Sequence, residues 1–243
     1  MIKIFIESGV NAAIKHDKET TNEQDFLVKF IAKYFPNYQY KKDFDIIGTN
    51  GWTNIPNIEY EFKENTDKGY SNVVIFDADE EKNGGGFAKR QAEILALKSG
   101  SIDFDLFLWP DNKNDGDFEL LLSKIVNPEH QCLLDCYEHF EEEVRANDPK
   151  EEKYETPGRK GKMYSYISLH KMSQKQKGSL SKGYWMFDDS KYWDLSSKEL
   201  EPLIDFLRKY FEKCALISIL FLCCDEETDR DDSCGSGGAH GGL

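Results

Sequence analysis

The stretch from Asn72 to Gly86, NVVIFDADEEKNGGG, decides the fold. It opens with an unbroken run of β-branched and aromatic residues, Val73 to Phe76, which is typical of a buried strand. Two carboxylates, Asp77 and Asp79, follow this run, and three glycines end the stretch. An unbroken apolar run fits a parallel strand that is covered on both faces, and ligands of parallel sheets bind beyond the carboxyl ends of the strands. The two aspartates are therefore predicted to leave the sheet at its ligand-binding edge.

The spacing of the two aspartates indicates a metal site. Two carboxylates that converge on one point repel each other unless a hard cation such as Mg²⁺ lies between them. We therefore predict that Asp77 and Asp79 hold one or two Mg²⁺ or Mn²⁺ ions. The alternative for the pair is a solvated acidic turn in front of a helix.

Strand and helix patterns alternate along the first half of the chain. Residues 2–6, 44–47 and 104–109 have the composition of short strands. Helical spacing of apolar residues follows Asn22, the glycines at 84–86, and Asp117. This alternation is typical of a parallel sheet in an α/β layer fold. Later helical patterns, at 131–145 and 200–211, predict a mainly helical C-terminal region.

Acidic residues follow three of the predicted strands. Glu7 follows the first strand, the aspartate pair follows the third, and Asp117 and Glu119 come after the fourth. If these strands are neighbours, the carboxylates meet at one end of the sheet. Glu7 would then complete a metal shell or accept the proton of an attacking group. The alternatives are a helix cap for Asp117 and a favourable helix-dipole position for Glu119.

These residues resemble the Toprim domain, the metal-binding fold shared by topoisomerases, bacterial primases and overcoming-lysogenization-defect nucleases. Glu7 with Gly9, the IFDAD of residues 75–79, and the LWPDN and GDFE of residues 108–119 carry the resemblance. Within that group the chain is similar to a stand-alone bacterial Toprim family of unknown function, over roughly residues 1–210. The turn after Glu7 is longer here than the usual step from Glu-Gly into the helix.

The resemblance implies a compact four-stranded parallel sheet flanked by helices on both sides. It also implies Mg²⁺ (or Mn²⁺) as the cofactor, with Glu7, Asp77 and Asp79 as catalytic residues. Glu119 matches a glutamate at a helix start of the family pattern. The predicted metal ligands are these four residues together with Asp117, which comes from the acidic loop after the fourth strand.

A basic segment interrupts an otherwise acidic chain. The net charge of −14 argues against a general nucleic-acid coat protein. Residues 156–187, however, contain no acidic residue and carry seven positive charges, interleaved with aromatic residues. We predict that these charges bind a nucleic-acid backbone, whereas the alternative is a solvated face with the aromatics in the core. The positive residues are Arg159, Lys160, Lys162, Lys171, Lys175, Lys177 and Lys182.

The chain is predicted to divide into three parts. Residues 1–128 form the Toprim-like metal-binding core, and residues 129–212 form a helical appendage that carries the basic segment. Residues 213–243 contain an apolar run followed by an acidic and glycine-rich tail, which we expect to be partly disordered.

The cellular compartment is predicted from the lack of a membrane-helix pattern and of a disulfide pattern. The longest apolar run, residues 214–224, is shorter than the ~18 residues that a membrane helix needs. Six cysteines show no small-domain disulfide spacing, so reduced thiols and the cytoplasm are expected, without membrane association. Cys132, Cys136 and His139 share one helix face, where buried thiols are favoured over a zinc site because no fourth ligand is evident.

The leading functional hypothesis is a Mg²⁺-dependent phosphoryl-transfer protein that acts on DNA or RNA, most simply an endonuclease. The resemblance to nucleases used in phage defence implies a partner ATPase, and a homo-oligomer is the alternative to such a partner. One alternative is a phosphatase of the haloacid-dehalogenase type, whose signature also contains Asp-x-Asp after a strand. The other is a non-catalytic binding or assembly module, in which the apolar run at 214–224 would form an interface.

Overall fold

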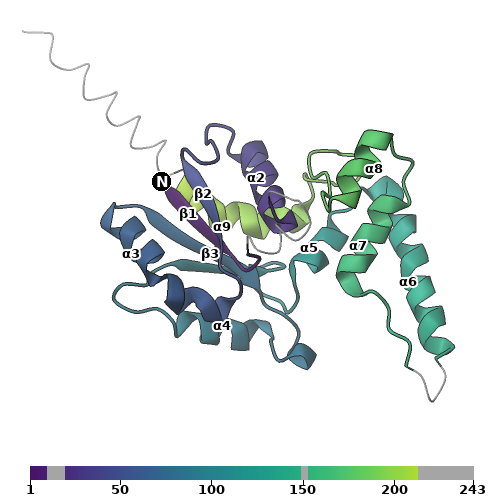
Figure 1. The fold of residues 1–243 in the computed structure, drawn as a ribbon, viewed down its shortest axis with the longest axis horizontal. Helices are drawn as coiled ribbons and strands as arrows, with labels where there is room; N and C mark the ends of the chain where they lie inside the picture. The colour runs from purple at the N-terminus through teal and green to yellow at the C-terminus, as the bar shows by residue number, and fades with distance from the viewer. Residues whose placement is uncertain (10–19, 149–152, 213–243) are drawn as a thin grey trace, which may run out of the picture.

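The computed structural model describes residues 1–9, 20–148 and 153–212 (Figure 1). Its centre is a four-stranded, fully parallel sheet in the order β2-β1-β3-β4. The strands are β1 (Ile2–Ile6), β2 (Phe44–Gly48), β3 (Ser71–Asp77) and β4 (Asp105–Trp109). This confirms the predicted α/β class with four parallel strands flanked by helices and followed by a helical C-terminal region.

Helices cover both faces of the sheet. One face is covered by α2 (Asn22–Tyr34), α5 (Phe118–Lys124) and α9 (Glu201–Phe211). The other is covered by η1 (Trp52–Ile58), α3 (Glu59–Asp67) and α4 (Phe87–Leu95), as Figure 1 shows for the two α-helices. Residues 55–71, which have no clear pattern in the sequence, thus form part of η1, all of α3 and the start of β3.

Side chains alternate between the two cores along each strand, as the period of a strand requires. Ile4, Ile75 and Phe107 lie in the core under α2 and α9. Phe5 and Val74 lie in the core under α3 and α4. All five are fully buried, which is why the strands read as unbroken apolar runs.

The strand order creates a crevice between β1 and β3. From β1 the chain crosses to β2 on one side, and from β3 it crosses to β4 on the other. The connections therefore diverge at the carboxyl ends of the two central strands, which is where ligands bind in open α/β sheets. Glu7 directly follows β1, and Asp77 is the last residue of β3.

Three helices extend the fold to one side of the sheet. They are α6 (Gln131–Ala146), α7 (Gly158–Ser168) and α8 (Gln174–Ser181), and α7 packs against both α5 and α6 (Figure 1). Short 3-10 helices, η2 (Glu81–Asn83), η3 (Pro128–His130) and η4 (Lys198–Leu200), lie in the connections. Within the described residues, no helix is both long enough and apolar enough to cross a membrane.

Helix α9 departs from the expected division of the chain, because it packs on the sheet. The rings of Phe206 and Phe107 are 5.3 Å apart, and those of Phe211 and Phe44 are 5.8 Å apart. The apolar stripe of α9 is buried there because α2 and α5 leave part of this face uncovered. The expected tail and the apolar run at 214–224 lie outside the described residues.

We predict that Leu207→Ala lowers the free energy of unfolding by about 2–5 kcal/mol, because Leu207 is fully buried between α9 and the sheet core. Lys209→Ala, on the exposed side of the same helix, should change it by less than about 0.5 kcal/mol. Urea unfolding measures both values. Equal stabilities of the two variants would contradict the packing of α9 on the sheet.

Candidate functional site

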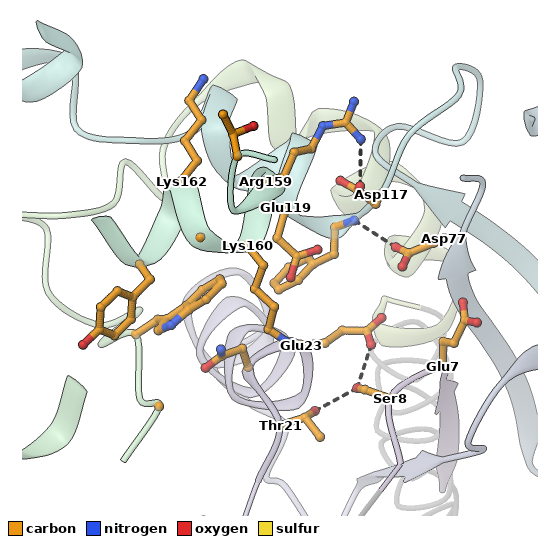
Figure 2. A pocket seen from close by; sticks show the side chains of 18 of the residues that line it. Glu7, Ser8, Thr21, Glu23, Asp77, Asp117, Glu119, Arg159, Lys160 and Lys162 are labelled. Atoms are coloured by element: carbon orange, nitrogen blue, oxygen red, sulfur yellow. Dashed lines mark hydrogen bonds and ion pairs between the residues drawn. The ribbon is translucent and has the colours of Figure 1, made fainter. Parts of the chain in front are cut away.

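A cavity of about 1180 Å³ lies at the carboxyl ends of the central strands (Figure 2). Its lining comes from the ends of β1 and β3, from the starts of α2 and α5, and from α6, α7 and the end of α8. The sheet edge and the helical extension therefore share one hollow, and residues distant in sequence face each other across it.

Four carboxylates form what we call the acidic wall of the cavity. Its members are Glu7, Glu23, Asp77 and Glu119, and Figure 2 shows their side chains gathered around the same space. Glu7, Asp77 and Glu119 are residues that the sequence singles out. The parallel strand order brings them together at one edge of the sheet. Glu7 follows β1, Asp77 is the last residue of β3, and Glu119 lies in the first turn of α5.

Asp77 lies at the centre of the acidic wall. Its Oδ1 accepts a hydrogen bond from the Phe118 backbone N–H at 2.8 Å. Burial raises the pKa of the Asp77 carboxyl well above its ordinary value, and the negative charges of the rest of the acidic wall raise it further. One hydrogen bond offsets only part of this effect, so the ionised form needs a nearby positive charge.

Asp79 points away from the cavity. It has a positive φ of 59°, and its backbone pairs with Gly116 through hydrogen bonds of 2.7 and 2.9 Å. Its Oδ2 accepts a hydrogen bond from Arg90 on α4 at 2.7 Å, and Asp79 is not among the lining residues. The left-handed backbone thus separates the two aspartates, whereas the sequence predicts that they converge.

Groups at both aspartates affect the pKa of Glu7. Burial raises the pKa of its carboxyl, and the negative charge of Asp79 adds to the rise. A hydrogen bond with the Asp77 backbone and the charge of Arg90 act in the opposite direction. Glu7 is therefore close to both aspartates, as the predicted site requires.

Glu23 is a site residue that sequence reasoning missed. Only 8% of it is exposed, and its carboxylate accepts hydrogen bonds from Trp109 Nε1 at 2.7 Å and from Ser8 Oγ at 2.9 Å. Burial raises the pKa of Glu23 to about 7, although both hydrogen bonds lower it. A signal was present, because Glu23 shares the apolar face of α2 with Phe26 and Phe30.

Asp117 and Arg159 join the sheet edge to α7. Asp117 caps α5 through Leu120 N–H, at 2.7 Å, which confirms the cap alternative. Its other oxygen accepts a hydrogen bond from Arg159 at 2.7 Å, and Arg159 also pairs with Glu80. The metal role predicted for Asp117 and the phosphate role predicted for Arg159 both have to compete with this ion pair.

Glu119 keeps its carboxyl turned into the cavity. Burial raises its pKa, the charge of Asp117 raises it further, and the positive charges of Lys160 and Arg159 lower it. Lys160 is thus the cation of the basic segment that lowers the pKa of Glu119 most.

The basic segment divides between the cavity and the outer surface. Arg159, Lys160, Lys162 and Lys182 line the cavity. Lys171, Lys175 and Lys177 are exposed on or next to α8 and do not line it. Its aromatics divide too: Tyr166 and Trp185 are buried in the core, as the alternative expects, whereas Tyr164 is exposed.

The chain can be assigned to a protein family. The model for a protein family of unknown function, DUF3226, matches residues 19–212. The chain belongs to DUF3226. No curated protein and no solved structure matches the chain. The matched residues include the whole acidic wall except Glu7, and they include the whole basic segment.

The donor set of this DUF3226 member suits a hard cation in chemistry. Every ligand that the acidic wall offers is a carboxylate oxygen, which Mg²⁺ and Mn²⁺ prefer. Within residues 1–9, 20–148 and 153–212, however, no three His, Cys, Asp or Glu side chains are arranged to hold a metal ion. Of the five predicted ligands, Asp79 and Asp117 are paired with arginines, and Glu7, Asp77 and Glu119 line the cavity.

The cysteines of α6 are not buried. Cys132 and Cys136 are exposed, and so is His139, which lies near Glu142 and Glu143. The expectation of buried thiols is wrong, because α6 buries its opposite face.

We predict that Glu23→Gln flattens the pH dependence of stability in the absence of divalent cations. The folded-state pKa of Glu23, about 7, lies above the unfolded value of 4.5, so the folded protein binds this proton more tightly. The free energy of unfolding then falls as pH rises between these two values, by at most about 3 kcal/mol. The glutamine removes this loss and still accepts from Trp109.

Urea unfolding at about pH 5 and about pH 8 in a chelator measures this effect. Glu129→Gln, at an exposed position of η3, is the matched control and should keep the wild-type pH dependence. An unchanged pH dependence in Glu23→Gln would show that Glu23 keeps an ordinary pKa in the folded protein.

Proposed function

We propose that this chain is a Mg²⁺-dependent phosphoryl-transfer protein that acts on nucleic acid, most simply an endonuclease. The observation that supports it best is the arrangement of the cavity. Four carboxylates, from the ends of β1 and β3 and the starts of α2 and α5, line the same cavity as three lysines of the basic segment. A phosphodiester needs both kinds of group, because its oxygens are negative and the cation beside it must be held by anions.

Glu7 and Asp77 would hold the cation, with Glu119 as a further ligand. Their raised pKa values have one cause in common, which is burial beside like charges, and the charge of a bound cation would offset it. Bound Mg²⁺ would supply positive charge against the charge that develops on the transferred phosphoryl group. Asp79 has a positioning role in this scheme, because it holds Arg90 next to Glu7.

Glu23 is suited to proton transfer. A carboxyl with a pKa of about 7 holds a proton in part of the molecules at neutral pH, which is the condition for general acid–base work. Trp109 and Ser8 fix its orientation toward the cavity. The phosphatase alternative receives no support from this geometry, because only Asp77 of the Asp-x-Asp pair lines the cavity.

We predict Mg²⁺- or Mn²⁺-dependent cleavage when the purified protein is incubated with supercoiled DNA or with RNA. Glu7→Gln and Asp77→Asn should each lower the rate on the order of 100-fold or more, the loss expected when charge stabilisation at the reacting group is removed. Asp79→Asn should lower it less. Lys175→Ala, an exposed lysine of α8 outside the cavity, should leave it unchanged.

Cleavage that persists undiminished in Asp77→Asn would refute the assignment. Cleavage lost equally in Asp77→Asn and Asp79→Asn would instead make both aspartates direct ligands, as the sequence predicts.

We further predict that Mg²⁺ stabilises the folded protein more at about pH 8 than at about pH 5. Protons compete with the cation for Glu7 and Asp77, whose pKa values are raised. A cation at 100 times its dissociation constant adds about 2.7 kcal/mol to the free energy of unfolding. Thermal unfolding with and without Mg²⁺ measures the effect, and Asp77→Asn should lose most of it. Equal stabilisation at both pH values would place the cation elsewhere.

A further inference from the structure

Most of the cations that line the cavity are already neutralised. Six Lys and Arg side chains line it, and four of them form ion pairs with carboxylates. The four pairs are Lys82–Glu80, Arg145–Glu141, Arg159–Asp117 and Lys162–Glu138. Lys160 and Lys182 form no ion pair with any described residue. Among the described residues that line the cavity, these two lysines are therefore the cations available to a ligand.

An exposed aromatic ring lies beside the available lysines. Tyr164 lines the cavity, and 47% of it is exposed, whereas Tyr166 and Trp185 are 1% and 3% exposed. Burial in the core explains Tyr166 and Trp185. It does not explain Tyr164, whose ring meets the open space of the cavity.

Lys160 and Tyr164 occupy one face of α7. They are four residues apart, so they lie about 6 Å apart along the helix axis, both facing the cavity. Lys160 is the end nearer to the acidic wall, because its charge acts on Glu119. Lys182, the residue directly after α8, lines the same cavity. A strand in the cavity would thus meet two cations and an aromatic ring.

We propose that the cavity binds single-stranded nucleic acid, with one base stacked on Tyr164 and backbone phosphates on Lys160 and Lys182. Every base offers a π-face to an aromatic side chain, and stacking of this kind tolerates any sequence. Within a duplex both faces of each base are covered by its neighbours, so Tyr164 reaches a base only in an unpaired strand. This inference names the substrate class of the proposed site. It rests on the proposed function only in assuming that the bound strand runs toward the acidic wall, and binding of the strand does not require that it is cleaved.

The test measures the fluorescence anisotropy of a labelled oligonucleotide that is either single-stranded or annealed to its complement. The full-length protein is added once in a buffer with Ca²⁺ and once in a buffer with a chelator. DNA and RNA versions of the same sequence are both used. Single strands should bind more tightly than duplex. Tyr164→Ala should weaken single-strand binding about 5- to 150-fold, the range for loss of one base–aromatic stack, and Tyr164→Phe should restore it. Tyr60→Ala, at a tyrosine of α3 that is 64% exposed and outside the cavity, should bind as the wild type does.

The lysines are tested by the salt dependence of the same binding. Lys160→Ala and Lys182→Ala should each reduce the slope of log K against log salt concentration by about 0.7, the value for one phosphate contact on a single strand. Lys175→Ala and Lys177→Ala are matched controls on the outer surface of α8 and should keep the slope. If Tyr164→Ala weakens binding but Lys160→Ala and Lys182→Ala keep the wild-type slope, the two lysines do not contact phosphates and that part of the proposal is wrong.

The outcomes separate this inference from the proposed function. Equal binding of single strand and duplex, or wild-type binding by Tyr164→Ala, overturns the inference even if Mg²⁺-dependent cleavage is found. Tyr164-dependent binding of single strands, together with no cation-dependent cleavage, supports the inference and overturns the proposed function. Absence of all nucleic-acid binding overturns the inference.

Discussion

Repulsion between buried carboxylates is the constraint on which the rest of the site depends. The strand order places Glu7 and Asp77 at the crevice between β1 and β3, and α2 and α5 add Glu23 and Glu119. Water solvates these groups poorly there, so each charge raises the cost of ionising the next. Such an arrangement costs stability unless protons or cations bind, and folds keep costs of this kind at positions that serve a function.

The ion pairs of Arg159 determine how the helical extension faces the sheet. Arg159 is the second residue of α7 and contacts both Glu80, after β3, and Asp117, the N-cap of α5. Because α7 also packs on α5, its remaining polar face is turned toward the acidic wall. The helical extension is therefore part of the cavity, although in sequence it begins after the last strand.

The sequence allowed prediction of the parts of the fold that local pattern determines. The apolar run at 73–76 marked the central strand, and Asp117 marked the start of α5, because burial on two faces and capping leave direct traces in the residues. The direction of Asp79 could not be predicted, since it depends on a left-handed backbone held by Gly116. The triple glycine belongs to the same turn: a Cβ on Gly85 would lie 2.3 Å from the Cβ of Asp79.

Other parts of the site depend on tertiary contacts that no local pattern encodes. The apolar face of α2 includes Glu23, but only the three-dimensional position of Trp109 shows why a carboxyl can be buried there. The ion pairs that divide the basic segment into neutralised and available cations join residues up to 79 positions apart, as Arg159 and Glu80 are. The position of α9 on the sheet likewise follows from space that α2 and α5 leave open.

Trp109 links the hydrophobic interior to the chemistry of the cavity. Its indole N–H holds Glu23, while its ring packs at 5.3 Å from Phe118 and at 6.0 Å from Phe26. A change at Phe26, which does not line the cavity, would move the indole and with it the carboxyl of Glu23. The acidity of this carboxyl is therefore set in part by ring packing deep in the hydrophobic core, away from the cavity.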